Sequence, residues 1–301
     1  MKGTIIKAYG GFFFVMVEDR VLRCKIRGRI RKHYGQVLIG DEVDLELAAC
    51  PAGAKGTSGA VNDDGVITDI YPRSSELVRP PVANVNQAVI IFSVDHPKPN
   101  TVLLDRFLLQ TYKAGIDPVL CFNKMDLIDF GDLDFFEDYA PAGYPVLKVS
   151  AKTGRNIDSL KQVLKGKISV FAGPSGVGKS SLLNALEPGL HLKTGAISQK
   201  LKRGRHTTRH VELMPLDCGG MVADTPGFSS MHLPAIRREE LANCYPEFND
   251  YKTDCRFSGC LHHREPDCAV KEAVAEGLIP LLRYQQYTML LQEVIEAERR
   301  Y

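Results

Sequence analysis

The sequence predicts a chain of three parts: an all-β barrel, an α/β domain built on a parallel sheet, and a helical module with a metal site. Short segments without a helical period fill residues 1–71. Apolar runs that alternate with helical patterns follow over residues 72–232. The last part, residues 233–301, carries three of the 8 cysteines within residues 255–268.

The first part is expected to form five short strands, over residues 3–8, 12–17, 21–27, 42–47 and 66–71. In the fourth, Val43, Leu45 and Leu47 alternate with acidic residues, which is typical of a strand with one buried face. A stretch rich in glycine, alanine and serine over residues 52–60 is expected to be a loop. Five strands without a helix favour a small barrel of the oligonucleotide/oligosaccharide-binding (OB) type.

The second part begins after Arg79-Pro80-Pro81, which we expect to be a stiff connector. Strands are expected at residues 87–94, 118–122, 146–149, 168–171, 211–214 and 221–223, with helices at 103–112 and 180–186. Near-continuous apolar strands separated by helices indicate a parallel sheet covered on both faces. In the third part, a charged helix is expected near residues 236–244, and a long helix from about Pro280.

A phosphate-binding loop follows the strand at 168–171. The pattern G-x-x-x-x-G-K-[ST] is met in full by Gly173, Pro174, Ser175, Gly176, Val177, Gly178, Lys179 and Ser180, with Ser181 next. Backbone N–H groups of such a loop surround a phosphate, the lysine reaches the β- and γ-phosphates, and the serine hydroxyl binds Mg²⁺. The alternative is a glycine-rich turn, but the strand before it and the helix after it favour a nucleotide site.

Two further motifs predict that the base is guanine. Asn123, Lys124, Met125 and Asp126 follow one strand, and Ser150, Ala151 and Lys152 follow the next. A carboxylate at Asp126 can accept hydrogen bonds from guanine N1–H and N2–H₂, a pair that adenine does not offer. A backbone N–H in the second motif can meet guanine O6. A GTP/GDP site with Mg²⁺ is therefore expected.

The γ-phosphate side of the site comes last in the chain. Asp224-Thr225-Pro226-Gly227 ends the strand at 221–223, where Asp224 suits the metal shell and the Gly227 N–H suits a γ-phosphate contact. Most GTPases place the base-reading motifs after the phosphate loop, whereas here they precede it. The sequence thus predicts a circularly permuted α/β P-loop GTPase domain, a rearrangement that surface-exposed domain ends permit.

The third part offers a structural zinc site. Cys255, Cys260 and Cys268, with either His262 or the adjacent His263, supply three thiolates and one imidazole, a closed tetrahedral set without a position for catalysis. The alternative, a group of reduced buried cysteines, does not explain the clustering.

A basic stripe is expected in the barrel. Residues 20–32 contain seven basic side chains and no acid, and alternation on a strand would place five of them on one face: Arg23, Lys25, Arg27, Arg29 and Arg31. Such a stripe suits RNA phosphates. The alternative is a solvated edge strand kept charged against aggregation.

The permuted order, the run Gly204-Arg205-His206-Thr207-Thr208 and the Cys/His cluster resemble the ribosome small subunit-dependent GTPase A family of bacteria, along essentially the whole chain. The resemblance implies an N-terminal OB-type barrel. It also implies GTP hydrolysis stimulated by the 30S subunit during its late maturation, with 16S rRNA as a partner. It favours His262 as the zinc ligand and, of Thr207 and Thr208, Thr208 as the switch threonine that binds Mg²⁺.

The catalytic group is expected in the same run. Phe228 stands where Ras-like enzymes carry the glutamine that orients water, and phenylalanine cannot do so. An imidazole near neutrality can, which makes His206 the candidate, in agreement with the resemblance. A second acid-free run over residues 188–211 surrounds it, and we expect rRNA to order this segment. The alternative for His206 is a solvated loop residue.

Composition bounds the class of protein. The chain has 301 residues, 44% hydrophobic and 25% charged, with a formal net charge of +2, which excludes a disordered chain and a globally basic coat. It lacks a signal-like leader and an apolar stretch of about 18 residues, so we expect a cytoplasmic protein without a membrane partner. We also expect a monomer. Two rival functions are an ATPase or small-molecule kinase, and an RNA-binding module with a purely structural GTP.

Overall fold

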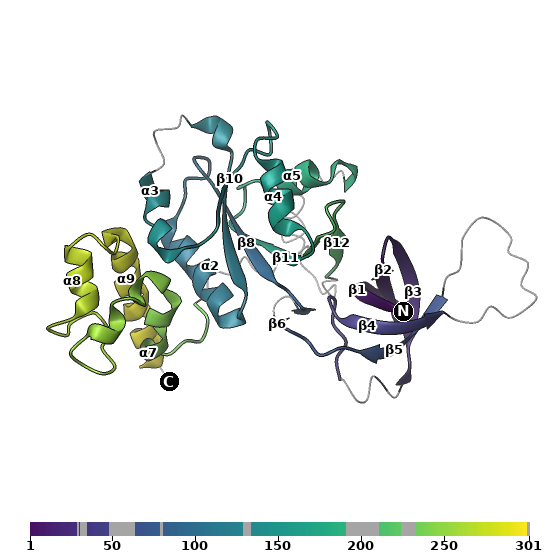
Figure 1. The fold of residues 1–301 in the computed structure, drawn as a ribbon, viewed down its shortest axis with the longest axis horizontal. Coiled ribbons are helices and arrows are strands. Elements are labelled where there is room, and N and C mark those ends of the chain that lie inside the picture. Colours follow the sequence, from purple (N-terminus) through teal and green to yellow (C-terminus); the bar gives the residue numbers. More distant parts are fainter. Residues whose placement is uncertain are drawn as a thin grey trace, which may run out of the picture.

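The structure is a computed structural model that describes residues 1–28, 30, 35–47, 64–78, 81–128, 134–190, 211–223 and 233–299. Figure 1 shows the barrel at one end, the sheet in the middle and the helical module at the other end. Among the described residues, no helix combines the length and the apolar character needed to cross a bilayer.

The first part is a closed barrel of five strands in the order β1-β2-β3-β5-β4. The strands are β1 (Lys2–Tyr9), β2 (Phe12–Val17), β3 (Arg20–Ile26), β4 (Glu42–Leu47) and β5 (Asp64–Ile70). The five expected strands are thus confirmed, because their alternation places one set of side chains, Val43 and Leu45 among them, in the core. The loop expected at residues 52–60 lies outside the described residues.

A two-stranded hairpin that the sequence did not predict links the barrel to the sheet. It consists of β6 (Glu76–Val78) and β7 (Pro81–Ala83), paired with Val78 opposite Pro81. The segment expected to be a plain connector therefore contributes strands. Pro81 lies at the first position of β7, where proline is compatible with a strand.

The second part is a six-stranded sheet in the order β10-β9-β8-β11-β13-β12. Its strands are β8 (Gln87–Ser93), β9 (Asp117–Asn123), β10 (Val146–Lys148), β11 (Ile168–Ala172), β12 (Leu213–Pro215) and β13 (Met221–Ala223). All pairs are parallel except β12 with β13. The predicted parallel sheet is confirmed, with one antiparallel edge strand.

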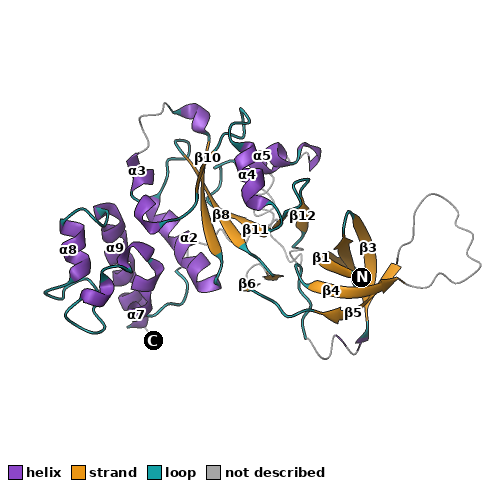
Figure 2. Cartoon of the chain, viewed as in Figure 1, coloured by secondary structure: helices purple, strands orange, loops and turns teal. Residues whose placement is uncertain are grey.

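Helices cover both faces of this sheet, as Figure 2 shows. Alternate residues of β8 face opposite sides: Ile90 packs with Leu104 and Phe107 of α2 (Thr101–Ala114), and Ile91 packs with the cluster of the other face. That other face is covered by α4 (Ile157–Leu164) and α5 (Lys179–Leu186). In the described part of the domain there are also the short helix α3 (Asp134–Glu137) and the 3-10 turns η1 (Met125–Leu127), η2 (Ala140–Ala142) and η3 (Pro188–Leu190).

The third part packs around its own apolar core. Its helices are α7 (Arg238–Leu241), α8 (Ala269–Ala275) and α9 (Leu281–Glu298), with 3-10 turns η5 (Ala242–Cys244), η6 (Pro246–Phe248) and η7 (Lys252–Asp254). The helix expected over 236–244 is shorter than predicted: the α-helix ends at Leu241, and residues 242–244 form the tighter 3-10 turn η5. The long final helix is confirmed.

Candidate nucleotide site and metal site

The phosphate-loop motif lies between β11 and α5. Gly173 and Gly178 have φ angles of 133° and 96°, which favour glycine. A Cβ on Gly173 would lie 2.1 Å from the carbonyl oxygen of Ile91, and one on Gly178 would lie 2.3 Å from Nδ2 of Asn123. Both glycines are therefore required by close contacts with neighbouring strands as well as by their own backbone.

Lys179 and Ser180 open α5, where their side chains can meet a phosphate. The Lys179 ammonium donates to the carbonyl oxygens of Gly173 and Pro174, both at 2.7 Å. Burial lowers the pKa of Lys179 to about 8. An anionic ligand would favour the charged form of this buried amine, as expected of a residue that binds phosphate. Ser180 is buried at the start of the helix, where N–H groups are unpaired.

The two base-reading motifs meet each other and the phosphate loop. Asn123, at the end of β9, is 1% exposed; its Nδ2 donates to the Val177 carbonyl oxygen at 2.9 Å, and its Oδ1 accepts from the Ala151 N–H at 3.1 Å. The Lys124 ammonium donates to the carbonyl oxygen of Gly176 at 2.8 Å and to that of His96. One asparagine and one lysine thus join three segments that are distant in the sequence.

Asp126 carries the carboxylate expected to read guanine. The Ser150 hydroxyl donates to Asp126 Oδ1 at 2.6 Å, and the Lys152 ammonium lies 3.7 Å from Oδ2. The hydrogen bond from Ser150 is the largest cause that lowers the pKa of Asp126. The carboxylate is therefore held ionised, as an acceptor for two donors of a base must be.

All these residues lie at the carboxyl ends of β9, β10 and β11, the edge at which parallel α/β sheets bind ligands. Met125 is buried in the core below them. The structure therefore brings together every motif residue that it describes. The carbonyl of His96 was missed by the sequence analysis, because a backbone acceptor leaves no signal in the residue type.

The remaining nucleotide-site predictions lie outside the described residues: His206, Thr207, Thr208, Asp224, Gly227 and the position of Phe228. The strand after that run begins two residues later than expected, as β12 at Leu213.

The basic stripe is only partly as predicted. Arg23 and Lys25 lie on the exposed side of β3, and both approach the Phe12 ring, at 5.0 Å and 5.3 Å from its centroid. Continuous alternation up to Arg31 is wrong, because β3 ends at Ile26 and the Ile30 N–H bonds the Arg27 carbonyl oxygen in a turn. Arg27 instead pairs with Glu46 at 2.9 Å. Arg29 and Arg31 lie outside the described residues.

The predicted metal ligands form a compact cluster. Ligand atoms of Cys255, Cys260, His262 and Cys268 all lie within 4.8 Å of one another. The His262 Nδ1 is 3.4 Å from the sulfurs of Cys255 and Cys268, which are 3.8 Å apart. Zinc–sulfur bonds of about 2.3 Å in a tetrahedron place sulfurs about 3.8 Å apart. The donor set and its spacing fit one structural zinc ion.

A carboxylate that the sequence analysis missed holds the metal loop. Glu265 accepts hydrogen bonds from the N–H groups of Leu261, His263 and Arg264 at 3.0–3.1 Å. Burial opposes its ionisation, but the backbone donors prevail and lower the pKa of Glu265 to about 2. The backbone N–H of His263 thus takes part in the hydrogen bonds of the loop. Of the two adjacent histidines, His262 supplies the imidazole of the cluster. The cysteines in the described part of the chain form no disulfide.

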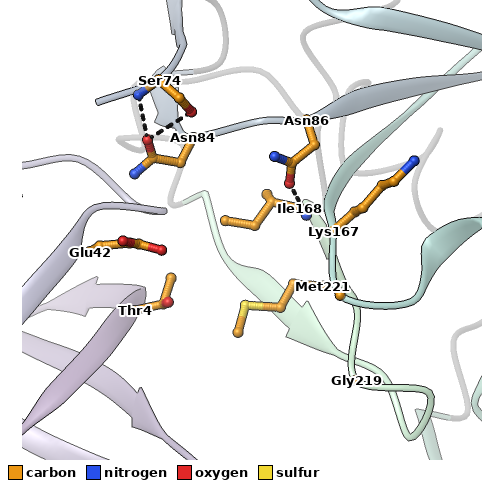
Figure 3. A pocket seen from close by; sticks show the side chains of 10 residues that line it. Thr4, Glu42, Ser74, Asn84, Asn86, Lys167, Ile168, Gly219 and Met221 are labelled. Atoms are coloured by element: carbon orange, nitrogen blue, oxygen red, sulfur yellow. Dashed lines mark hydrogen bonds between the residues drawn. The ribbon is translucent and has the colours of Figure 1, made fainter. Parts of the chain in front are cut away.

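A cavity of about 330 Å³ lies at the opposite edge of the sheet from the nucleotide motifs. Barrel residues Thr4 and Glu42 line it together with Ile168 and Met221, which begin β11 and β13 (Figure 3). In the wall that the sheet forms, the Ile168 N–H donates to Asn86 Oδ1 at 2.7 Å. This bond joins the start of β11 to the residue before β8. The cavity lies between part of the barrel and part of the sheet, and none of the predicted site residues lines it.

Comparison with known proteins decides the family. The family model described as RsgA GTPase matches residues 70–234, and that of the RsgA N-terminal domain matches residues 2–54. The chain belongs to the RsgA GTPase family. Membership makes it a GTP hydrolase, in agreement with the nucleotide motifs, and implies Mg²⁺ together with the nucleotide.

Relatives of this family match along the whole chain. A protein of Moorella thermoacetica named small ribosomal subunit biogenesis GTPase RsgA is 48% identical over 99% of each chain. One of the same name from Caldanaerobacter subterraneus is 45% identical over 100% of this chain and 98% of its own.

Two solved structures share the fold. YjeQ from Thermotoga maritima has a TM-score of 0.79 at 38% identity, covering 98% of each chain. YloQ, described as a circularly permuted GTPase, has a TM-score of 0.80 at 39% identity, covering 100% of this chain and 96% of its own. The expected permuted P-loop GTPase domain is confirmed.

Proposed function

We propose that this chain is a cytoplasmic GTPase that binds the small ribosomal subunit and its 16S rRNA during late maturation, and that subunit contact stimulates hydrolysis. The observation that carries the proposal is the convergence of the guanine-reading and phosphate-binding motifs in one site, within a family whose full-length relatives are named for small-subunit biogenesis. We further propose that the chain acts as a monomer, without a membrane partner, and that its functional parts are residues 1–71, 72–232 and 233–301.

The nucleotide is held by residues at the carboxyl edge of the sheet. Asp126 accepts from guanine, Lys179 binds the β- and γ-phosphates, and Ser180 with Thr208 would hold Mg²⁺. When bound there, Mg²⁺ would neutralise charge on the phosphates. The zinc ion would fix the loop of the C-terminal module without taking part in the reaction.

Hydrolysis requires a group that positions water. We assign this role to His206, with Gly227 contacting the γ-phosphate, since Phe228 cannot orient water. The barrel would supply the RNA contact through Arg23 and Lys25, whose charges lie beside an aromatic ring on which a base can stack.

The decisive experiment is GTP turnover by the purified protein with and without 30S subunits, with ATP as the control nucleotide. We expect strong stimulation restricted to GTP. The variant His206→Ala should lose stimulated turnover but retain GTP binding, whereas His210→Ala, an imidazole change in the same acid-free run, should retain both. Turnover of GTP that 30S subunits leave unchanged would refute the ribosomal role.

A further inference from the structure

The barrel makes a direct backbone contact with the chain that enters β12. Lys7 of β1 forms an isolated antiparallel bridge with Glu212, and the Lys7 ammonium lies 3.1 Å from Oε1 of Glu212. In Figure 1, β12 lies at the side of the sheet that faces the barrel, above β1. Glu212 comes four residues after Thr208 and six after His206. The contact thus lies just downstream of the proposed catalytic run.

The course of β1 makes this contact possible. Along one edge, β1 pairs with β4 only through Lys2, Gly3 and Thr4. Ile5 then exchanges backbone hydrogen bonds with residues 40 and 41, at 2.7 Å and 2.9 Å. Lys7 is the next residue of β1 whose backbone faces that edge. Its partner there is Glu212, which takes the place that β4 occupies at the start of β1. A bulge between Ile5 and Lys7 on the β2 side bends the strand here. Two open sheet edges therefore cover each other at this point.

The residues on either side of Glu212 are buried in an apolar core that the barrel and the sheet share. Val211 and Leu213 are 8% and 1% exposed, and both belong to the same apolar cluster as Ile5 and Val15 of the barrel. The described pairs of β12 with β13 begin at Leu213, opposite Ala223. Glu212 thus contacts the barrel at the point where the chain joins its own sheet, between two buried residues.

The contact lies in register with the basic side chains of β3. Directly paired residues form one row across four segments: Arg23 opposite Phe14, Phe14 opposite Lys7, and Lys7 opposite Glu212. Directly paired side chains share a face of the sheet. A polyanion bound at Arg23 would therefore lie on the same face as the Lys7–Glu212 ion pair.

We propose that Lys7 and Glu212 are a positioning pair through which the barrel sets the rate of GTP hydrolysis. The inference rests on the proposed function only in placing the catalytic run at residues 206–208. Neither residue belongs to the nucleotide-binding motifs. The pair fixes where the chain enters β12, and reversing one charge would put like charges about 3 Å apart.

The test uses charge reversal and restoration. The single variants are Lys7→Glu and Glu212→Lys, and the double variant carries both changes. The matched control is the Lys2–Glu42 pair, which lies 2.7 Å apart at the other end of β1, has similar exposure, and is reversed in the same way. The measurements are single-turnover GTP hydrolysis at saturating nucleotide without ribosomes, and the dissociation constant for GTP.

Each single reversal should lower the hydrolysis rate constant about two- to fivefold, the range of an exposed ion pair, while GTP affinity stays unchanged. The double variant should recover the rate of the unaltered protein, and the control variants should keep it. An unchanged or increased rate in the single variants, a failure of the double variant to recover, or an equal loss in the control pair would each overturn the inference.

Adding 30S subunits separates this inference from the proposed function. If subunits fail to stimulate the unaltered protein while the single variants still hydrolyse slowly, the ribosomal role is refuted and the positioning pair stands. If subunits stimulate all variants and the unaltered protein to the same rate, with equal rates in their absence, the positioning pair is refuted and the ribosomal role stands.

Discussion

Replacing Arg283 by methionine should detach the helical module from the GTPase domain. The Arg283 guanidinium donates to Asp105 of α2 and, through Nε at 2.6 Å, to Glu247. Side chains of all three are 1% exposed. The rings of Tyr139 and Tyr245 lie on the guanidinium, each with its centroid 4.6 Å away. One cation on α9 thus holds together residues of α2 and η6 and the two tyrosines that directly precede η2 and η6.

The expected loss follows from burial. Removing the cation leaves two buried carboxylates without an opposite charge, and breaking a buried ion pair on one side costs about 3–5 kcal/mol. The matched control is Arg106→Met. Arg106 joins the same two helices, α2 and α9, through Glu293 at 2.7 Å, but this pair is partly exposed, so its loss should cost at most about 1 kcal/mol.

The pH dependence gives the prediction a sign. Burial raises the pKa of Asp105 to about 6, with Arg283 acting in the opposite direction. Between pH 3.8 and about 6, the folded state therefore holds a proton on Asp105 that the unfolded chain releases. The stabilisation from this proton is present at low pH and is lost as the pH rises through the folded pKa. Without Arg283 the pKa of Asp105 rises further. The deficit of the variant should be largest above pH 7 and should shrink near pH 5.

Native-state hydrogen exchange of α9 amides measures this loss locally, which suits a chain of several parts. The exchange free energies of α9 should fall by about 3–5 kcal/mol in Arg283→Met and by at most about 1 kcal/mol in Arg106→Met at pH 7.5. Equal losses in the two variants, or a deficit that grows on acidification, would refute the reasoning.

Three further predictions concern the nucleotide and metal sites. Ser150→Ala removes the hydroxyl that donates to Asp126 and should weaken GTP binding about tenfold in a fluorescent-nucleotide titration; a change below twofold would contradict it. Because the pKa of Lys179 is about 8 without nucleotide, GTP binding at pH 8 should take up about half a proton, measured by calorimetry in buffers of different ionisation enthalpy. Uptake near zero would contradict that value. Cys268→Ser should lose the one zinc per chain and loosen the module while GTP affinity persists, whereas Cys244→Ser, at a buried cysteine outside the cluster, should keep the metal in elemental analysis.

The motif residues could be predicted because their spacing is set by local backbone geometry. The phosphate loop needs Gly173 and Gly178 at fixed positions between a strand and a helix, and the structure places them there. The same holds for Asn123 and Asp126 at the end of a strand. Order along the chain then predicted the permutation without any knowledge of contacts.

Contacts between distant segments could not be predicted in this way. Arg283 and Asp105 are separated by 178 residues, and an arginine on a helix surface pattern usually faces water. Glu265 carries no signal that distinguishes it from its acidic neighbours, yet it holds the backbone of the metal loop. The bridge of Lys7 to Glu212 depends on where β4 leaves β1, which the strand pattern does not encode.

In the permuted order, both outer parts of the chain meet the GTPase domain within a few residues of the segments that we propose to contact the γ-phosphate. In this order the sheet is entered at β8 and left at β13, so Leu233, only six residues after Gly227, already packs against the core of the helical module. On the other side, Glu212 bridges to the barrel. Each outer part thus makes a packed contact within six residues of a residue to which we assign a role at the γ-phosphate, Thr208 on one side and Gly227 on the other. We therefore expect a ligand that moves either part to change the rate of hydrolysis.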